Sequence, residues 1–276
     1  MGTLDGKAAI VSGSGRGIGR EIAMKLASEG AGVVVNDLDE GPAHETVTAI
    51  TEAGGRAVAC VGSVTDEGFA ERFVGTAVDE LGGLDIIVNN AGYTWDSVIQ
   101  KMSDEQWDAI LDVHLKAPFR ILRAAQPVIA ASVKAAREQG APVPCRKVVN
   151  ISSVAGLGGN AGQANYSAAK AGITGLTKTL AKEWGRYNVT VNTVAFGMIK
   201  TRLTEVPADG DGTIDVAGRE IKVGVNPDLL AAMESMIPLG RGGTPEEAAG
   251  AVYMFCTPDS NYVSAQTLVC GGGFMI

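Results

Sequence analysis

Three residues, Ser153, Tyr166 and Lys170, have side chains and a spacing that suit proton transfer. Tyr166 and Lys170 are four positions apart, so on a helix they project from the same face. An ammonium group beside a phenol favours the phenolate and lowers the pKa of the tyrosine from its usual value near ~10. Tyr166 is therefore a candidate general acid and base, and Ser153 a candidate hydrogen-bond partner for a substrate oxygen. The Tyr-Lys pair alone is also typical of a solvated helix, so the rest of the sequence has to decide.

A glycine-rich turn follows the first apolar segment, residues 7–12, which we expect to be a buried strand. After the turn, Ile18, Ile22 and Leu26 recur every four residues, as on the sheet-facing side of a helix. The free N–H groups and the dipole at such a helix N-terminus bind phosphate. The glycines follow G-x-x-x-G-x-G and not the strict G-x-G-x-x-G, and a turn that binds no ligand stays an alternative. The turn consists of Gly13, Ser14, Gly15, Arg16, Gly17, Ile18 and Gly19.

A second apolar strand, residues 33–37, ends in Asp37, eighteen residues after Gly19. An acidic residue at this place hydrogen-bonds the ribose hydroxyls of a dinucleotide and repels a 2′-phosphate. The sequence therefore favours NAD over NADP. Arg16 is a competing partner for a 2′-phosphate, and a helix N-cap is the alternative role for Asp37.

With these segments in place, nearly the whole chain resembles the short-chain dehydrogenase/reductase family. Asn89-Asn90-Ala91-Gly92 is similar to the Asn-Asn-Ala-Gly motif of that family, and residues 192–201 take the place of its Asn-x-x-x-Pro-Gly-x-x-x-Thr segment. The resemblance implies a nicotinamide cofactor. Beside the glycine turn, it implies cofactor contacts from Asp37, Ser63, Val64, Asn90, Ala91, Gly92, Tyr166, Lys170, Gly197, Ile199 and Thr201.

Three positions depart from the family pattern. His114 replaces the usual catalytic Asn, Phe196 replaces the usual Pro before Gly197, and Ser63 replaces the Asp that commonly meets the adenine. An imidazole nitrogen is able to hold the water that the Asn anchors, so His114 is expected to complete a water relay. A packed core histidine is the alternative.

The stretch 159–166 and the pair Asn36-Asp37 are most similar to 3-oxoacyl-[acyl-carrier-protein] reductases and (3R)-hydroxyacyl-CoA dehydrogenases. The resemblance implies hydride transfer between the nicotinamide and a secondary alcohol or ketone, most directly a 3-hydroxyacyl or 3-oxoacyl thioester. In this scheme Tyr166 moves the proton, while Lys170 lowers the pKa of Tyr166 and holds the nicotinamide ribose. A steroid or xenobiotic alcohol dehydrogenase is one alternative, and a catalytically silent NAD-binding protein is another. A serine hydrolase is disfavoured, because the chain has no G-x-S-x-G elbow and only two His residues.

Alternating strands and helices predict one α/β domain over residues 1–276. The resemblance implies a Rossmann-like, doubly wound sheet of seven parallel strands in the order 3-2-1-4-5-6-7. Capping boxes begin two helices, with Ser103 before Gln106 and Thr244 before Glu247. The seven strands are expected near residues 7–12, 33–37, 56–61, 84–88, 146–151, 189–194 and 266–270.

Two stretches exceed a minimal fold. Residues 132–146 are expected to extend one helix and to add a Pro-rich loop. Residues 202–240 hold a Gly/Asp-rich segment at 208–212, a hairpin at 213–223, and an amphipathic run ending in Met233 and Met236. A substrate lid is expected at 202–240, with an oligomer contact as the alternative.

Composition narrows the partners and the compartment. The chain has 276 residues, of which 46% are hydrophobic, and a net charge of −8, which argues against nucleic acid or an anionic membrane as partner. Its four cysteines show neither disulfide nor zinc spacing, so no metal site is expected. We find no signal peptide or membrane-spanning run, so the expected compartment is the cytoplasm. The family resemblance implies a homo-oligomer, most directly a tetramer.

Overall fold

A sheet of seven parallel strands forms the centre of the computed structural model, which describes residues 2–201, 212–216, 218–223 and 227–274. The strand order is β3-β2-β1-β4-β5-β6-β9, which confirms the doubly wound sheet expected from the sequence. Each of the seven strands begins within two residues of its expected start. Their bounds are β1 Ala8–Val11, β2 Gly32–Val35, β3 Arg56–Ala59, β4 Ile86–Asn89, β5 Arg146–Ser153, β6 Val189–Phe196 and β9 Thr267–Cys270.

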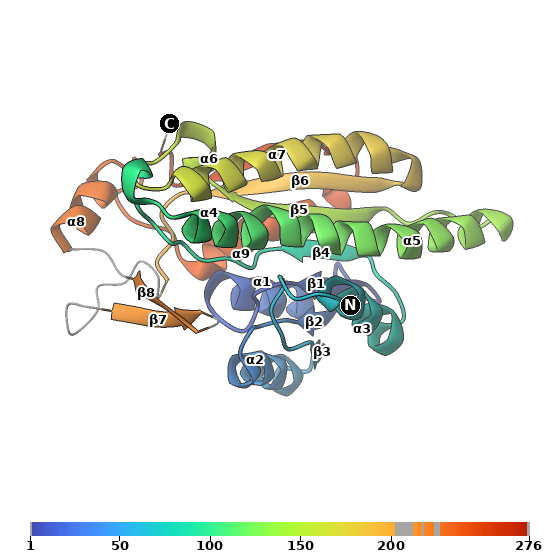
Figure 1. The fold of residues 1–276 in the computed structure, drawn as a ribbon. Helices are drawn as coiled ribbons and strands as arrows, with labels where there is room; N and C mark the ends of the chain where they lie inside the picture. Colours follow the sequence, from blue (N-terminus) through green and yellow to red (C-terminus); the bar gives the residue numbers. More distant parts are fainter. Residues whose placement is uncertain (1, 202–211, 217, 224–226, 275–276) are drawn as a thin grey trace.

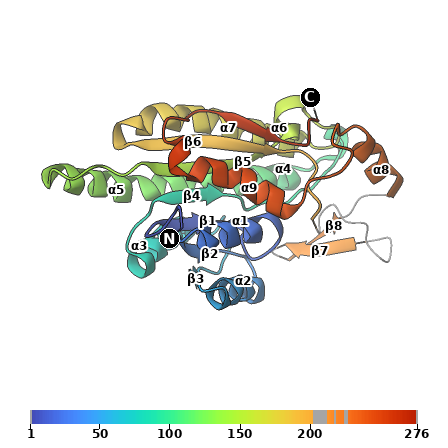
Figure 2. The ribbon, with the colours of Figure 1, turned by 180° about the vertical axis from the view of Figure 1, so that it is seen from behind.

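Helices cover both faces of this sheet (Figures 1 and 2). One face carries α3 (Phe69–Leu81), α4 (Asp104–Leu111), α5 (Ala117–Glu138) and α7 (Ala164–Trp184). The other face carries α1 (Gly17–Ser28), α2 (Glu40–Glu52) and α9 (Pro245–Cys256). A short helix, α6 (Val154–Gly158), follows β5 directly, and a π-helical turn, η2 (Asp112–Lys116), joins α4 to α5.

The buried strands explain this layering. Every residue of β1 is buried, and alternate residues face opposite sides: Ala9 and Val11 pack in the core under α1 and α9, while Ala8 and Ile10 pack in the core under α3 and α5. A parallel strand that is apolar on both faces requires helices on both sides. The strand order reverses between β1 and β4, which is where open α/β sheets bind ligands at the carboxyl ends of the strands.

Both predicted capping boxes are present. The Ser103 hydroxyl accepts from the Gln106 amide at 3.1 Å, and the Gln106 side chain accepts from the Ser103 amide at 3.0 Å. Thr244 and Glu247 make the same reciprocal pair at the start of α9. The sequence therefore predicts these two helix starts to the residue.

The two extra stretches take the expected secondary structure. α5 runs on to Glu138, and a loop with Pro142 and Pro144 leads into β5. The expected hairpin is β7 (Gly212–Val216) with β8 (Arg219–Val223), and the amphipathic run forms α8 (Pro227–Ser235). Residues 208–211 of the expected Gly/Asp-rich segment lie outside the described residues. The hairpin and α8 lie at the same end of the molecule as α6, where β5 ends (Figures 1 and 2).

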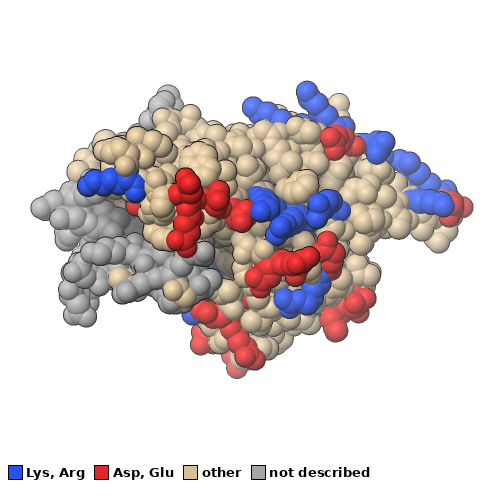
Figure 3. Space-filling view, viewed as in Figure 1, with Lys and Arg blue, Asp and Glu red and all other residues tan. Residues whose placement is uncertain are grey.

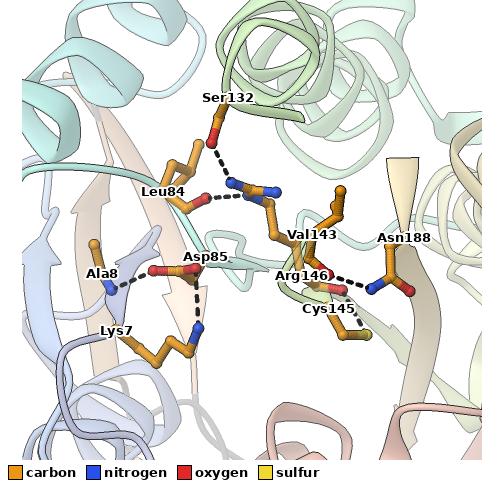
Figure 4. Close-up of polar contacts among 9 residues, drawn as sticks. All are labelled: Lys7, Ala8, Leu84, Asp85, Ser132, Val143, Cys145, Arg146 and Asn188. Atoms are coloured by element: carbon orange, nitrogen blue, oxygen red, sulfur yellow. Dashed lines mark hydrogen bonds and ion pairs between the residues drawn. The ribbon is translucent and has the colours of Figure 1, made fainter. Parts of the chain in front are cut away.

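Polar contacts fasten the opposite end of the sheet (Figure 4). The buried Arg146 guanidinium donates to the Leu84 carbonyl at 3.0 Å and to the Ser132 hydroxyl at 2.6 Å. Asp85 accepts from Lys7 Nζ at 3.3 Å and from the Ala8 amide at 3.1 Å. These contacts join the amino ends of β1, β4 and β5 to α5.

Within the described ranges, no helix is long and apolar enough to cross a membrane. The same residues contain no group of three or more His, Cys, Asp or Glu side chains placed to hold a metal ion.

Candidate functional site

Ser153 is the last residue of β5 and the N-cap of α6. Its Oγ accepts from the Ala155 amide at 3.2 Å, which fixes the side chain at the carboxyl end of the sheet. The Ser153 hydroxyl also lies close enough to Tyr166, thirteen residues later in the chain, to lower the pKa of its phenol. The expected meeting of Ser153 and Tyr166 is therefore present.

Tyr166 and Lys170 lie one turn apart on α7, with Lys170 buried and Tyr166 half-buried. Lys170 Nζ lies 5.5 Å from the centre of the Tyr166 ring and donates to the carbonyl oxygen of Ile151 at 2.8 Å. Only 4% of Lys170 is exposed. A lysine held this deeply is not the solvated helix residue that the spacing alone allowed.

Burial dominates the electrostatics of the pair. It raises the pKa of Tyr166 to about 12, against a hydrogen bond from Ser153 that lowers the value, and the charge of Asp96 raises it further. Burial also lowers the pKa of Lys170 to about 7. The sequence predicts a lowered pKa for Tyr166, and the structure departs from this prediction. Desolvation penalises both the phenolate of Tyr166 and the ammonium of Lys170, so less positive charge stands beside the phenol at neutral pH.

His114 also lies at this site, in the π-helical turn η2 and 4% exposed. Its ring meets the Tyr166 ring edge-on, with centroids 5.0 Å apart. His114 Nε2 lies 2.7 Å from the Tyr93 carbonyl, which only accepts, so Nε2 carries the hydrogen and Nδ1 is left as an acceptor. Nδ1 is buried and has no hydrogen-bond partner among the described residues. Burial, with a smaller contribution from the charge of Lys170, lowers the pKa of His114 well below its usual value, so the ring is neutral.

Gly92 is required by this histidine. A Cβ on Gly92 would collide with the imidazole of His114, so only glycine fits there. The Asn-Asn-Ala-Gly turn therefore serves the proton-transfer site as well as the cofactor side.

Two polar residues at the site were not identified from the sequence as site residues. Asp96 accepts from Gln163 Nε2 at 2.7 Å, and burial raises the pKa of Asp96. Gln163 in turn accepts from Asn160 at 2.9 Å. This chain ties the loop after the Asn-Asn-Ala-Gly turn to the start of α7. Such a pair, 67 positions apart, has no local signal in the sequence.

The glycine turn has the form of a phosphate cradle. Gly13 and Gly17 take positive φ angles of 61° and 53°, and a Cβ on Gly13 would lie 2.7 Å from the Ala91 backbone. Arg16 is the N-cap residue of α1, and its side chain makes no capping hydrogen bond. The first turn of α1 has no acidic residue. The amide groups at this helix start suit an anion. Ser14 and Ile18 complete the turn, Ser14 fully buried and Ile18 packed on the core.

Two asparagines hold this cradle in place. The Gly13 amide donates to Asn36 Oδ1 at 3.1 Å, and Asn90 Nδ2 donates to the carbonyls of Ser12 and Gly13, each at 3.0 Å. Asn90 thus links the end of β4 to the turn that follows β1. The residues present fit a dinucleotide.

Asp37 stands against the same turn, because a Cβ on Gly15 would lie 2.5 Å from its Oδ2. Its Oδ1 accepts from the Asp39 amide at 3.1 Å. Arg16, the competing phosphate partner, is paired with Asp39 at 2.8 Å on the surface.

The remaining expected cofactor residues line the same end of the sheet. Ser63 Oγ lies 2.7 Å from Thr65 Oγ1, and Val64 beside it is buried. Ile199 is buried and forms a bridge with Gly243, while Gly197 and Thr201 are half-buried. Phe196, in place of the usual Pro, continues β6 between Ser153 and Cys270 and is buried in the core.

Comparison with known proteins agrees with this geometry. A family model described as Enoyl-(Acyl carrier protein) reductase matches residues 13–275. The chain is 38% identical to 3-oxoacyl-[acyl-carrier-protein] reductase FabG of Vibrio cholerae over 275 residues, 99% of each chain. It is 37% identical to 3-oxoacyl-[acyl-carrier-protein] reductase of Synechocystis over 278 residues, 100% of each chain. It is also 38% identical to the short-chain reductase protein NovJ of Streptomyces niveus over 265 residues, 96% of this chain and 92% of the other. The chain therefore belongs to the short-chain dehydrogenase/reductase family, and the family and these relatives support an oxidoreductase that acts on CH–OH groups with a nicotinamide cofactor.

Proposed function

We propose that this protein is an NAD(H)-dependent oxidoreductase that interconverts 3-oxoacyl and 3-hydroxyacyl thioesters in the cytoplasm. The observation that carries the proposal is the gathering of Ser153, Tyr166 and Lys170 at the carboxyl end of β5, next to the glycine cradle. Two relatives named as 3-oxoacyl-[acyl-carrier-protein] reductases support the substrate class. A steroid or xenobiotic alcohol dehydrogenase is the second candidate, since a relative named only as a short-chain reductase is also 38% identical.

Bound at this site, the nicotinamide supplies or accepts the hydride. Tyr166 donates its phenolic proton to the ketone oxygen in reduction and takes it back in oxidation. Its raised pKa of about 12 keeps the phenol protonated at neutral pH, ready to donate. Ser153 holds the same oxygen by its hydroxyl.

Lys170 and His114 have supporting roles in this proposal. Lys170 lies beside the phenol, where it is only partly charged at neutral pH, and holds the nicotinamide ribose. The free acceptor of His114, Nδ1, accepts from a water that returns protons to Tyr166 through Lys170.

His114→Asn, which still binds a water, should keep turnover within a few-fold. His114→Leu should lose at least ~10-fold, and an unchanged rate would remove the relay from the proposal.

Asp37 and the pairing of Arg16 with Asp39 support NAD over NADP. The carboxylates of Asp37 and Asp39 lie beside the glycine turn and would repel a 2′-phosphate there, and the Arg16 guanidinium is already paired with Asp39.

The carrier of the acyl group is a separate question from the chemistry. Lys178, Lys182 and Arg186 are exposed on α7 and after it, where an acidic carrier protein has room to bind. Figure 3 shows Lys and Arg side chains on this side of the molecule, interspersed with Asp and Glu. A solvated face explains this mixture as well, so we commit to the thioester and not to its carrier.

A substrate panel tests the assignment. NADH oxidation should be measured with acetoacetyl-CoA, longer 3-oxoacyl-CoAs and 3-oxoacyl carrier protein, beside cyclic ketones and ketosteroids. The proposal predicts turnover of the thioesters. Turnover of the ring ketones alone would replace it with the second candidate.

A further inference from the structure

Buried polar side chains line the side of β5 that faces α7. Asn150 and Ser152 are alternate residues of the strand and are 0% and 1% exposed, and Thr177 of α7 is 1% exposed. Polar groups at this depth are costly unless they are hydrogen-bonded. Their partners therefore show what this part of the chain holds in place.

The contacts form a ladder between the strand and the helix. Ser152 Oγ donates to the Lys170 carbonyl at 2.7 Å, and Asn150 Nδ2 donates to Thr177 Oγ1 at 2.9 Å. Thr177 Oγ1 also accepts from the Thr193 hydroxyl of β6 at 2.8 Å. Asn150 Oδ1 accepts from Asn89 Nδ2 of β4 at 2.7 Å. Side chains of β5 and β6 thus bind α7, and Asn89 of β4 holds Asn150 in place.

Thr177 follows Lys170 by seven residues, two helical turns on the same face. The ladder therefore holds α7 at two levels, at the Lys170 carbonyl and at the Thr177 hydroxyl. A helix fixed at two levels is restrained from sliding along the strand and from rotating about its axis.

We propose that Thr177, held by Asn150 and Thr193, is a positioning residue that sets the register of α7 and so places Tyr166 and Lys170 against Ser153. The inference rests on the proposed function, because it assigns a purpose to the placement of those three residues. Thr177 touches neither substrate nor cofactor in this scheme. Its effect reaches the reaction only through the geometry of α7, where an error of about 1 Å in placement costs up to ~100-fold in rate.

Thr177→Val tests this directly, because valine keeps the shape and the β-branch but removes the hydroxyl that accepts two buried hydrogen bonds. We expect kcat to fall about 10-fold while KM stays within about 2-fold, since substrate binding is untouched. Thr177→Ser restores the acceptor and should return kcat to within about 3-fold of wild type.

Ser132→Ala is the matched control. It removes an exposed hydroxyl that accepts a hydrogen bond from the buried Arg146 at the opposite end of the sheet (Figure 4), and so removes a side-chain hydrogen bond of β5 far from the candidate site. It should lower the melting temperature without lowering kcat. An unchanged kcat in Thr177→Val, an equal loss in Thr177→Ser, or an equal loss in Ser132→Ala would overturn the inference.

Hydrogen exchange gives a second measurement that needs no activity. Amides of α7 around Lys170 should exchange faster in Thr177→Val than in wild type, Thr177→Ser or Ser132→Ala. If the wild-type protein turned over no thioester or ketone, the proposed function would fail. The exchange rates would then decide alone whether Thr177 sets the register, and equal rates in all four proteins would refute it.

Discussion

The ammonium of Lys170 donates a 2.8 Å hydrogen bond to the carbonyl oxygen of Ile151, two residues before Ser153. Lys170, one of the candidate catalytic residues, thus links α7, which also carries Tyr166, to β5, which carries Ser153. A carbonyl oxygen is neutral and offsets only part of the cost of burying a charge, and burial lowers the pKa of Lys170 to about 7.

This burial predicts a pH-dependent stability. A lysine has a pKa near 10.5 in the unfolded chain, so between about pH 7 and 10 the unfolded state binds more protons at Lys170 than the folded state. Burial of Lys170 should therefore destabilise the folded protein most near pH 7. The free energy of unfolding should rise by about 1 kcal/mol, because of this group, for each pH unit in this window.

Lys170→Met isolates that contribution. The variant should be more stable than wild type near pH 7, and the gap should narrow as the pH rises to 10, in urea unfolding of the protein without cofactor. Taking the difference between the two proteins cancels the titration of the groups that Lys170 does not influence. A gap of constant size over this range would show that Lys170 does not titrate near 7.

Cofactor preference should follow Asp37 and Asp39. NADH should bind at least ~10-fold more tightly than NADPH, because a 2′-phosphate would meet the carboxylate of Asp37. Asp37→Ala should shrink that gap. Asp39→Asn should also shrink it, by releasing Arg16 from its 2.8 Å ion pair. Equal binding of NADH and NADPH by wild type would mean that Arg16 outweighs the carboxylates.

The oligomeric state is predicted to be a homotetramer or a homodimer, built through α5, α7 and β9. A groove between α4, α5 and α7 is lined by Leu111, Leu115, Phe119 and Leu176, and Phe119 is 45% exposed. Phe119→Asp should lower the mass found by light scattering at micromolar concentration, whereas Val78→Asp on α3 should not. A monomeric mass for wild type would refute the prediction.

Local sequence patterns were sufficient for the parts of the fold that depend on local chemistry. Apolar runs predict all seven strands, and the capping boxes at Ser103 and Thr244 predict two helix starts. The spacing of Tyr166 and Lys170 predicts a shared helix face, and the family resemblance brings Ser153 to them.

Properties that depend on tertiary packing were not predictable in this way. The raised pKa of Tyr166 follows from burial, which residue spacing does not report. The hydrogen bond of Asp96 with Gln163 joins two loops that are far apart in the sequence. The free Nδ1 of His114 follows from the position of the Tyr93 carbonyl, which only the folded chain defines.

The central claim is that Tyr166 transfers the proton in a reaction of a nicotinamide with a carbonyl substrate. Its most direct test is the rate of NADH oxidation with acetoacetyl-CoA, measured for wild type and for Tyr166→Phe beside their affinities for NADH. We expect the variant to lose more than ~100-fold in turnover while NADH binding stays within a few-fold, because only the proton donor is removed. Unchanged turnover in Tyr166→Phe would contradict it.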